Sequence, residues 1–93
     1  MSRKERRAQH SADGTLTPNA FVEVANKFID VANRQNASIK ATQVHTAFLY
    51  GSARYSAFVA KNVLDVENQE TFVEEMVKQY ADMLRQHLAD PSV

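Results

Sequence analysis

Apolar residues recur every three to four positions along most of this chain, in three stretches separated by short polar segments. This spacing places them on one face of a helix with about 3.6 residues per turn. The pattern predicts helices over residues 18–36, 40–63 and 67–89, joined by loops at 36–39 and 64–67. Because short loops join neighbouring helices in antiparallel order, we expect an all-α fold, a three-helix antiparallel bundle with the middle helix at its centre.

The first helix has a clear start signal in the sequence. Thr17 is a favourable N-cap residue, and Pro18 suits the first helical position. Leu16 and Phe21 have the spacing of a hydrophobic staple. Residues 1–14 carry almost no apolar side chains, which is typical of a disordered segment. We therefore expect a flexible basic arm over residues 1–16 and a helical domain over residues 17–90.

The middle helix carries apolar or small side chains around most of its circumference. Large apolar residues cover about half of the helical wheel, and one strip holds only small side chains. This small strip consists of Thr46, Ala53, Ala57 and Ala60. Small residues let another helix approach closely. Since two further helices of the same chain cannot cover the whole surface, we expect the small strip to contact a second copy or another protein.

A narrow polar stripe on the middle helix carries Arg54, one turn after Tyr50. One interpretation is a solvated arginine whose aliphatic stem lies on the Tyr50 ring. The other is an arginine that binds an anion or a partner. Asn33 of the first helix, Tyr50 and Arg54 are therefore the candidate residues for a polar or anion-binding site.

Two histidines, His45 and His87, fall inside the apolar arcs of their helices. Both are 21 residues from position 66, so an antiparallel hairpin with its loop there would bring them to the same level. They are either two half-buried structural histidines or a pH-sensitive pair, because protonation of both would bring like charges together. No third ligand is obvious, so we expect no metal site.

Charge is distributed unevenly, although the formal net charge is zero. Residues 1–64 carry nine Lys or Arg against four Asp or Glu, and residues 65–93 carry two against seven. A basic front and an acidic back favour internal or head-to-tail attraction over general binding to polyanions. The arm could still contact the phosphates of nucleic acid or the ribosome through Arg3, Lys4, Arg6 and Arg7.

Several functional classes lack the residues that they need. The chain has no cysteine, which excludes disulfides and thiolate metal sites, and it has no apolar stretch long enough to span a membrane. No secretory signal begins the sequence, so we expect a cytoplasmic protein. Phosphate-loop, dinucleotide-binding, zinc-protease and nucleophile-elbow motifs are absent, and we therefore expect neither an enzyme nor a cofactor.

Two short elements and one pattern resemble a known family. They are Phe28-Ile29-Asp30-Val31-Ala32-Asn33, the segment Leu49 to Tyr55, and Tyr80 with Met83 and Leu84 in the acidic last helix. The chain resembles, over about residues 19–88, a family of short bacterial proteins catalogued only as a domain of unknown function. The resemblance implies a small helical cytoplasmic protein and brings no activity, substrate or catalytic residue.

The sequence therefore predicts a protein-interaction, structural or regulatory module that self-associates. Its expected partner is a second copy, in a homodimer, or another protein. Two alternatives stay open. One is contact with nucleic acid or the ribosome through the basic arm, and the other is binding of a small ligand near Arg54.

Overall fold

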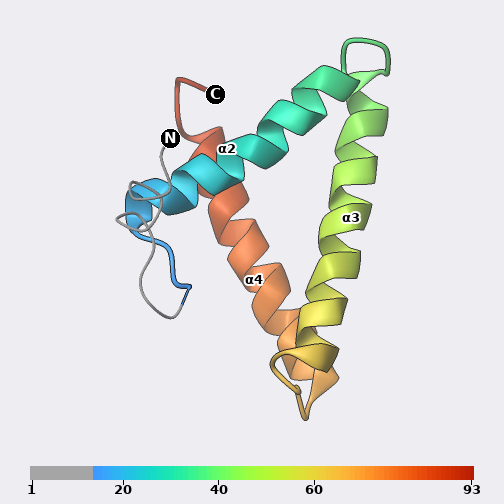
Figure 1. Ribbon diagram of the computed structural model, residues 1–93, viewed down its shortest axis with the longest axis vertical. Coiled ribbons are helices and arrows are strands. Elements are labelled where there is room, and N and C mark those ends of the chain that lie inside the picture. The colour runs from blue at the N-terminus through green and yellow to red at the C-terminus, as the bar shows by residue number, and fades with distance from the viewer. Residues whose placement is uncertain (1–13) are drawn as a thin grey trace. The chain divides into compact units, whose positions relative to one another are not determined.

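The computed structural model describes residues 14–93, and these form three helices in chain order (Figure 1). Helix α2 spans Pro18–Gln35, α3 spans Ala41–Asn62 and α4 spans Gln69–Leu88. The predicted all-α class is confirmed, and each predicted boundary lies within two residues of the observed one.

The predicted N-cap and first helical position of α2 are confirmed, whereas the staple of Leu16 and Phe21 stays a prediction. The Thr17 side chain accepts a hydrogen bond from the backbone N–H of Ala20 at 3.2 Å, and Pro18 occupies the first helical position. Thr17 thus satisfies one of the N–H groups that have no partner in the first turn. At the other end, the N–H of Asn36 donates to the carbonyl of Ala32 at 3.0 Å.

The chain divides into two compact units, and the boundary between them lies within α3, between Tyr50 and Gly51. In the described part of the chain, the first unit holds α2 and the first half of α3. The second unit holds the rest of α3 and all of α4. Antiparallel packing of all three helices into one bundle therefore stays a prediction.

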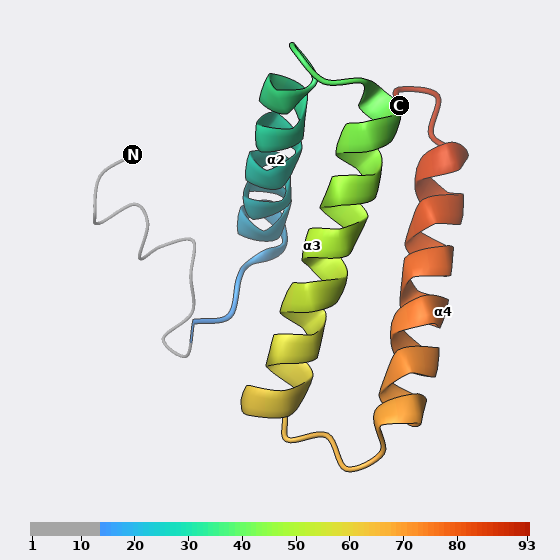
Figure 2. The ribbon, with the colours of Figure 1, turned by 90° about the vertical axis from the view of Figure 1, so that its right-hand side faces the viewer.

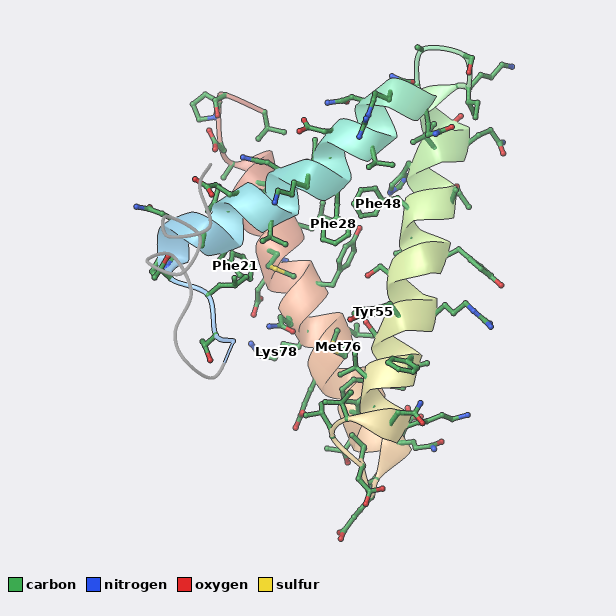
Figure 3. All side chains as sticks on the ribbon, in the orientation of Figure 1. Phe21, Phe28, Phe48, Tyr55, Met76 and Lys78 are labelled. Atoms are coloured by element: carbon green, nitrogen blue, oxygen red, sulfur yellow. The ribbon has the colours of Figure 1, made fainter. Side chains whose placement is uncertain are left out.

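In the first unit, a short loop joins α2 to α3, and few side chains are enclosed. Ala20 is 1% exposed, whereas Phe28 is 60% and Phe48 is 43% exposed. Figure 3 shows Phe28 on α2 and Phe48 on α3 pointing toward one another, yet much of each ring stays open to solvent. The apolar face of α2 is thus formed but largely uncovered.

In the second unit, a loop over residues 63–68 connects α3 to α4 (Figure 2). The N–H of Val66 donates to the carbonyl of Ala60 at 3.0 Å, which satisfies a carbonyl in the last turn of α3. Near this loop, Ala60 is buried at 8% exposure. Half-buried residues of the two helices on either side of this loop are Ser56 and Val59 on α3, and Phe72 and Met76 on α4. We define this edge of the two helices as the hairpin face.

Helix α4 begins at a cap that the sequence pattern did not identify. The side chain of Asn68 accepts a hydrogen bond from the backbone N–H of Thr71 at 3.0 Å. Glu70 lies in the first turn, and Arg85 and His87 lie in the last. This order of charges complements the helix dipole.

We predict that the same substitution, Asn to Ala, has opposite effects at two positions. Asn68→Ala removes the cap of α4 and should lower the free energy of unfolding by about 1 kcal/mol. Asn26→Ala, at an exposed interior position of α2, should raise it by a few tenths of a kcal/mol, because alanine has the higher helix propensity. Urea denaturation at one fixed protein concentration measures both. Equal effects of the two substitutions would contradict the capping role.

Asp65 gives a second stability prediction, since its φ of 50° lies in the left-handed region. Glycine adopts this conformation without steric cost, so Asp65→Gly should raise the free energy of unfolding by about 0.5–1 kcal/mol. Glu67→Gly in the same loop is the matched control, because it removes the same charge without relieving a positive φ. A control variant as stable as Asp65→Gly would show that charge, rather than backbone strain, is responsible.

Candidate functional site

An open hollow lies on one side of α3 in the second unit. It has a volume of about 430 Å³ and is lined by Gly51, Arg54, Tyr55 and Phe58. The rings of Tyr55 and Phe58 stack with their centroids 6.1 Å apart. These two rings make the hollow mostly apolar, and Arg54 supplies a positive charge at its edge.

Gly51 creates the depth of the hollow. A Cβ atom added at this position would meet nothing within 4 Å. Glycine in a helix interior costs about 1 kcal/mol relative to alanine. No described part of the chain uses the close approach that the missing side chain permits, so the space above Gly51 is open to a group from outside.

The hollow differs in kind from an ordinary small-molecule pocket. All four lining residues come from a single helix. Small-molecule sites usually bury most of their ligand between several elements. An open, apolar depression on one helix is better matched to the side chain of another helix.

The structure places two of the three residues of the predicted polar site on the same helix. Tyr50 and Arg54 lie one turn apart on α3, and both are exposed. Among residues 14–93, no carboxylate forms an ion pair with Arg54. Asn33 is exposed on α2 in the other compact unit from Arg54, so its part in the site stays a prediction.

The small strip of α3 is unevenly accessible. Ala53 and Ala57 are exposed, and the exposed Thr46 donates a hydrogen bond to the carbonyl of Thr42 at 3.0 Å. Ala60 is already buried at 8% exposure. Three of its four members are thus available to another helix, and its role as an interface stays a prediction.

The predicted histidine pair divides between the two units. His45 lies on the first half of α3 and His87 in the last turn of α4, and both side chains are exposed. Their proximity stays a prediction. The predicted nucleic-acid residues of the arm lie outside the described residues.

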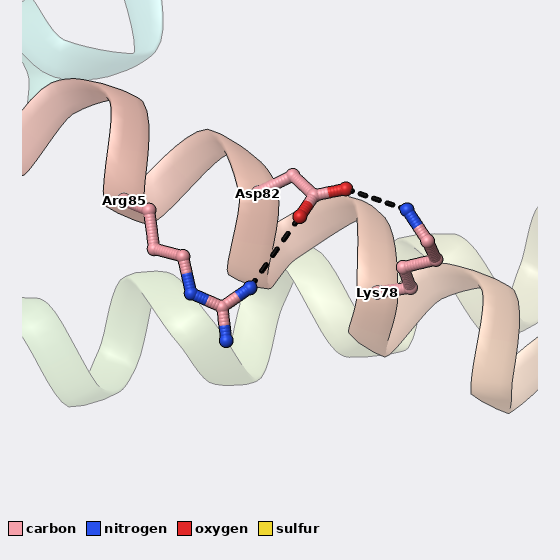
Figure 4. A network of polar contacts seen from close by, with 3 residues as sticks. All are labelled: Lys78, Asp82 and Arg85. Carbon is pink, nitrogen blue, oxygen red and sulfur yellow. Dashed lines mark hydrogen bonds and ion pairs between the residues drawn. The ribbon is translucent and has the colours of Figure 1, made fainter.

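Helix α4 carries an ion-pair network on its exposed surface (Figure 4). Asp82 accepts from Lys78 at 2.8 Å and from Arg85 at 3.4 Å. The hydrogen bond to Asp82, and then the charge of Asp82, raise the pKa of Lys78. All three side chains are well exposed, so the network marks a solvated surface of the helix.

The described residues provide neither a membrane span nor a metal site. No helix in residues 14–93 combines the length and apolar content that crossing a membrane requires. In the same range, no three histidine or carboxylate side chains gather closely enough to hold a metal ion.

Sequence reasoning missed the hollow, although its signal was present. Gly51, Arg54, Tyr55 and Phe58 have the spacing i, i+3, i+4, i+7, which places four residues around one point of a helix surface. The helical wheel assigned Arg54 to a polar stripe and the other three to the apolar half, and so it separated neighbours that line one site.

Comparison with known proteins identifies the family. The model of the family described as "Protein of unknown function (DUF3144)" matches residues 21–91. The chain belongs to this family, as its helical elements suggested. No curated protein and no solved structure matches the chain.

A pH-dependent contact at the end of α4 gives a testable prediction. The backbone N–H and the hydroxyl of Ser92 donate to the Asp90 carboxylate at 2.9 and 2.8 Å. These two bonds, with a smaller effect of the His87 charge, hold the pKa of Asp90 below its ordinary value of 3.8. Ser92→Ala should raise the pKa of Asp90, which should nevertheless stay below 3.8 because the backbone bond remains.

The sign of the linked stability follows from that direction. A carboxyl group with a lowered folded pKa binds fewer protons in the folded state than in the unfolded state. Its stabilisation is therefore fully present above about pH 4 and is lost as pH falls through the folded pKa. Titration of the Asp90 carboxyl carbon by NMR checks this. A pKa at or above 3.8 in the unmutated chain, or one that Ser92→Ala leaves unchanged, would contradict the assignment.

Proposed function

We propose that this member of the family is a helical interaction module that self-associates into a dimer or a larger assembly. One observation carries the proposal. Twenty large apolar or aromatic side chains are at least 43% exposed, and the only buried residues of the described chain are Ala20 and Ala60. Exposure on this scale is typical of surfaces that contact another protein.

The physical basis is the hydrophobic effect. Burying a valine, leucine or phenylalanine side chain contributes about 1.5–3 kcal/mol. A chain of this length has a total stability of only about 5–15 kcal/mol. Covering even a few of the exposed side chains by association would therefore contribute a large share of the stability.

The occupant of these faces is best supplied by a second copy of the chain. Each copy has a net charge of zero, so the copies do not repel one another as a whole. Helix α3 contains Arg54 and Lys61 and no carboxylate, whereas α4 contains four carboxylates and two basic residues. Two copies can thus place a basic helix beside an acidic one while covering apolar surface.

Contact with the second copy is proposed for α3, where two surfaces are candidates. One is the small strip, through its exposed members Thr46, Ala53 and Ala57. The other is the hollow around Gly51. The alternative function, a small-ligand site near Arg54, would use the same hollow, but its single-helix lining supports a protein contact better.

Sedimentation equilibrium over a wide concentration range tests self-association. We expect a reversible dimer or larger species that becomes populated at micromolar to tens-of-micromolar concentrations. Its formation should weaken little as salt rises, because most of the buried area is apolar. A chain that remains monomeric at several hundred micromolar would refute the proposed function.

A further inference from the structure

The four residues around the hollow have the arrangement of a coiled-coil hole. In helix pairs with knobs-into-holes packing, a side chain of one helix inserts among four residues of the other. Positions i, i+3, i+4 and i+7 surround such a hole, and Gly51, Arg54, Tyr55 and Phe58 occupy these positions. We call this set the α3 hole.

The α3 hole points away from the contact between α3 and α4 of its own chain. At about 100° per residue, its centre lies about 140° around α3 from the mean direction of Ser56, Val59 and Ala60. Those three residues form the α3 side of the hairpin face. The helix that packs on the hairpin face therefore cannot also fill the hole.

A matching set of residues lies on α4. Glu70, Val73, Glu74 and Val77 have the same i, i+3, i+4, i+7 spacing, and we call them the α4 quartet. Val73 is 47% and Val77 is 63% exposed, and both glutamates are exposed. The α4 quartet thus presents apolar knobs beside two negative charges.

The α4 quartet also points away from the hairpin face. Its centre lies about 130° around α4 from Phe72 and Met76. Two helices that already meet along one edge cannot also bring together surfaces on their outer sides. The hole and the quartet of one hairpin are therefore complementary in shape and charge, but they cannot meet within that hairpin.

We propose that the α3 hole of one copy receives a valine of another copy's α4 quartet, with Arg54 beside Glu74 of that copy. This inference rests on the proposed self-association. The contact is head-to-tail, because the hole and the quartet of one chain lie on opposite sides of its hairpin and one further copy cannot cover both. A pair of chains therefore contains one such contact, and further copies can add at the hole and the quartet that remain open.

Charge reversal on opposite sides of the contact gives a test that separates pairing between chains from pairing within one. In the homodimer of Arg54→Glu, two carboxylates face one another at each contact, and in that of Glu74→Arg two guanidinium groups do. For each variant alone, the Kd of the homodimer should rise by a factor of about ten or more. In an equimolar mixture, each variant should instead pair with the other variant, because every contact between unlike chains joins opposite charges.

The heterodimer of the two variants can form in two ways. In one, the substituted positions face one another with their charges exchanged, and in the other the original Arg54 faces the original Glu74. Either contact joins opposite charges, whereas a homodimer of either variant joins like charges. The Kd of the heterodimer should consequently approach that of the unmutated chain.

Two matched controls change the same charges outside the two sets. They are Lys40→Glu and Glu75→Arg. Lys40 lies just before α3, and Glu75 lies on α4 but is not a member of the quartet. Each should dimerise about as well as the unmutated chain, and their mixture should show no preference for the heterodimer. Fluorescently labelled chains in analytical ultracentrifugation report the homodimers and heterodimers, and circular dichroism confirms that each variant is helical.

The outcomes distinguish this inference from the proposed function. A monomeric unmutated chain refutes both. A dimer whose Kd is unaffected by Arg54→Glu and Glu74→Arg retains self-association and overturns the contact proposed here. Dissociation by Ala57→Glu, with Arg54→Glu still dimeric, would assign the contact to the small strip. Dimerisation could also recover in a chain that carries both Arg54→Glu and Glu74→Arg, but not in the mixture of the two single variants. That result would show that the two positions pair within one chain, and it would also overturn the inference.

Discussion

A helix in a hairpin has one neighbour and can bury only the face that meets it. This constraint governs both compact units of the chain, because each contains two helical segments joined by a short loop. The enclosed positions are small, Ala20 in one unit and Ala60 in the other, while large side chains such as Phe28 and Val77 remain mostly exposed. The chain thus forms its helices completely but covers little of the apolar surface that would stabilise them.

Helix α3 shows how the uncovered surface is organised. Around the hairpin face it contacts its own chain, and on the opposite side Gly51 leaves a depression between two aromatic rings and Arg54. An alanine at Gly51 would favour the helix and meet no neighbour within the chain. The glycine therefore weakens the isolated helix, and the compensation we propose is close approach by α4 of a second copy.

The sequence predicted the secondary structure well because local signals determine it. Apolar periodicity located all three helices, and the Thr17-Pro18 pair identified the start of α2. Asn68 was not identified as a cap because the helix was predicted to begin at residue 67, before it. The sequence likewise carries no sign of the left-handed conformation of Asp65. Asp65 lies in the loop where the N–H of Val66 donates to the carbonyl of Ala60.

The candidate site was less predictable for a physical reason. A helical wheel assigns each residue to an arc, but a hole depends on the depth left by a small side chain among larger ones. Gly51 counted as an apolar position on the wheel, whereas in the structure its missing side chain opens the hollow. The proximity of His45 and His87 and the role of Asn33 depend on contacts across the two units, which local patterns do not determine.

Thermal unfolding as a function of protein concentration tests the central claim, that a second copy covers the exposed apolar faces. Association that stabilises only the folded chain makes the melting temperature depend on concentration. Our account predicts that Tm rises by several degrees over a hundredfold increase in concentration, while the helical signal of the folded state stays the same. A Tm independent of concentration, with a single cooperative transition, would show that one chain covers its own apolar surface and would contradict the account.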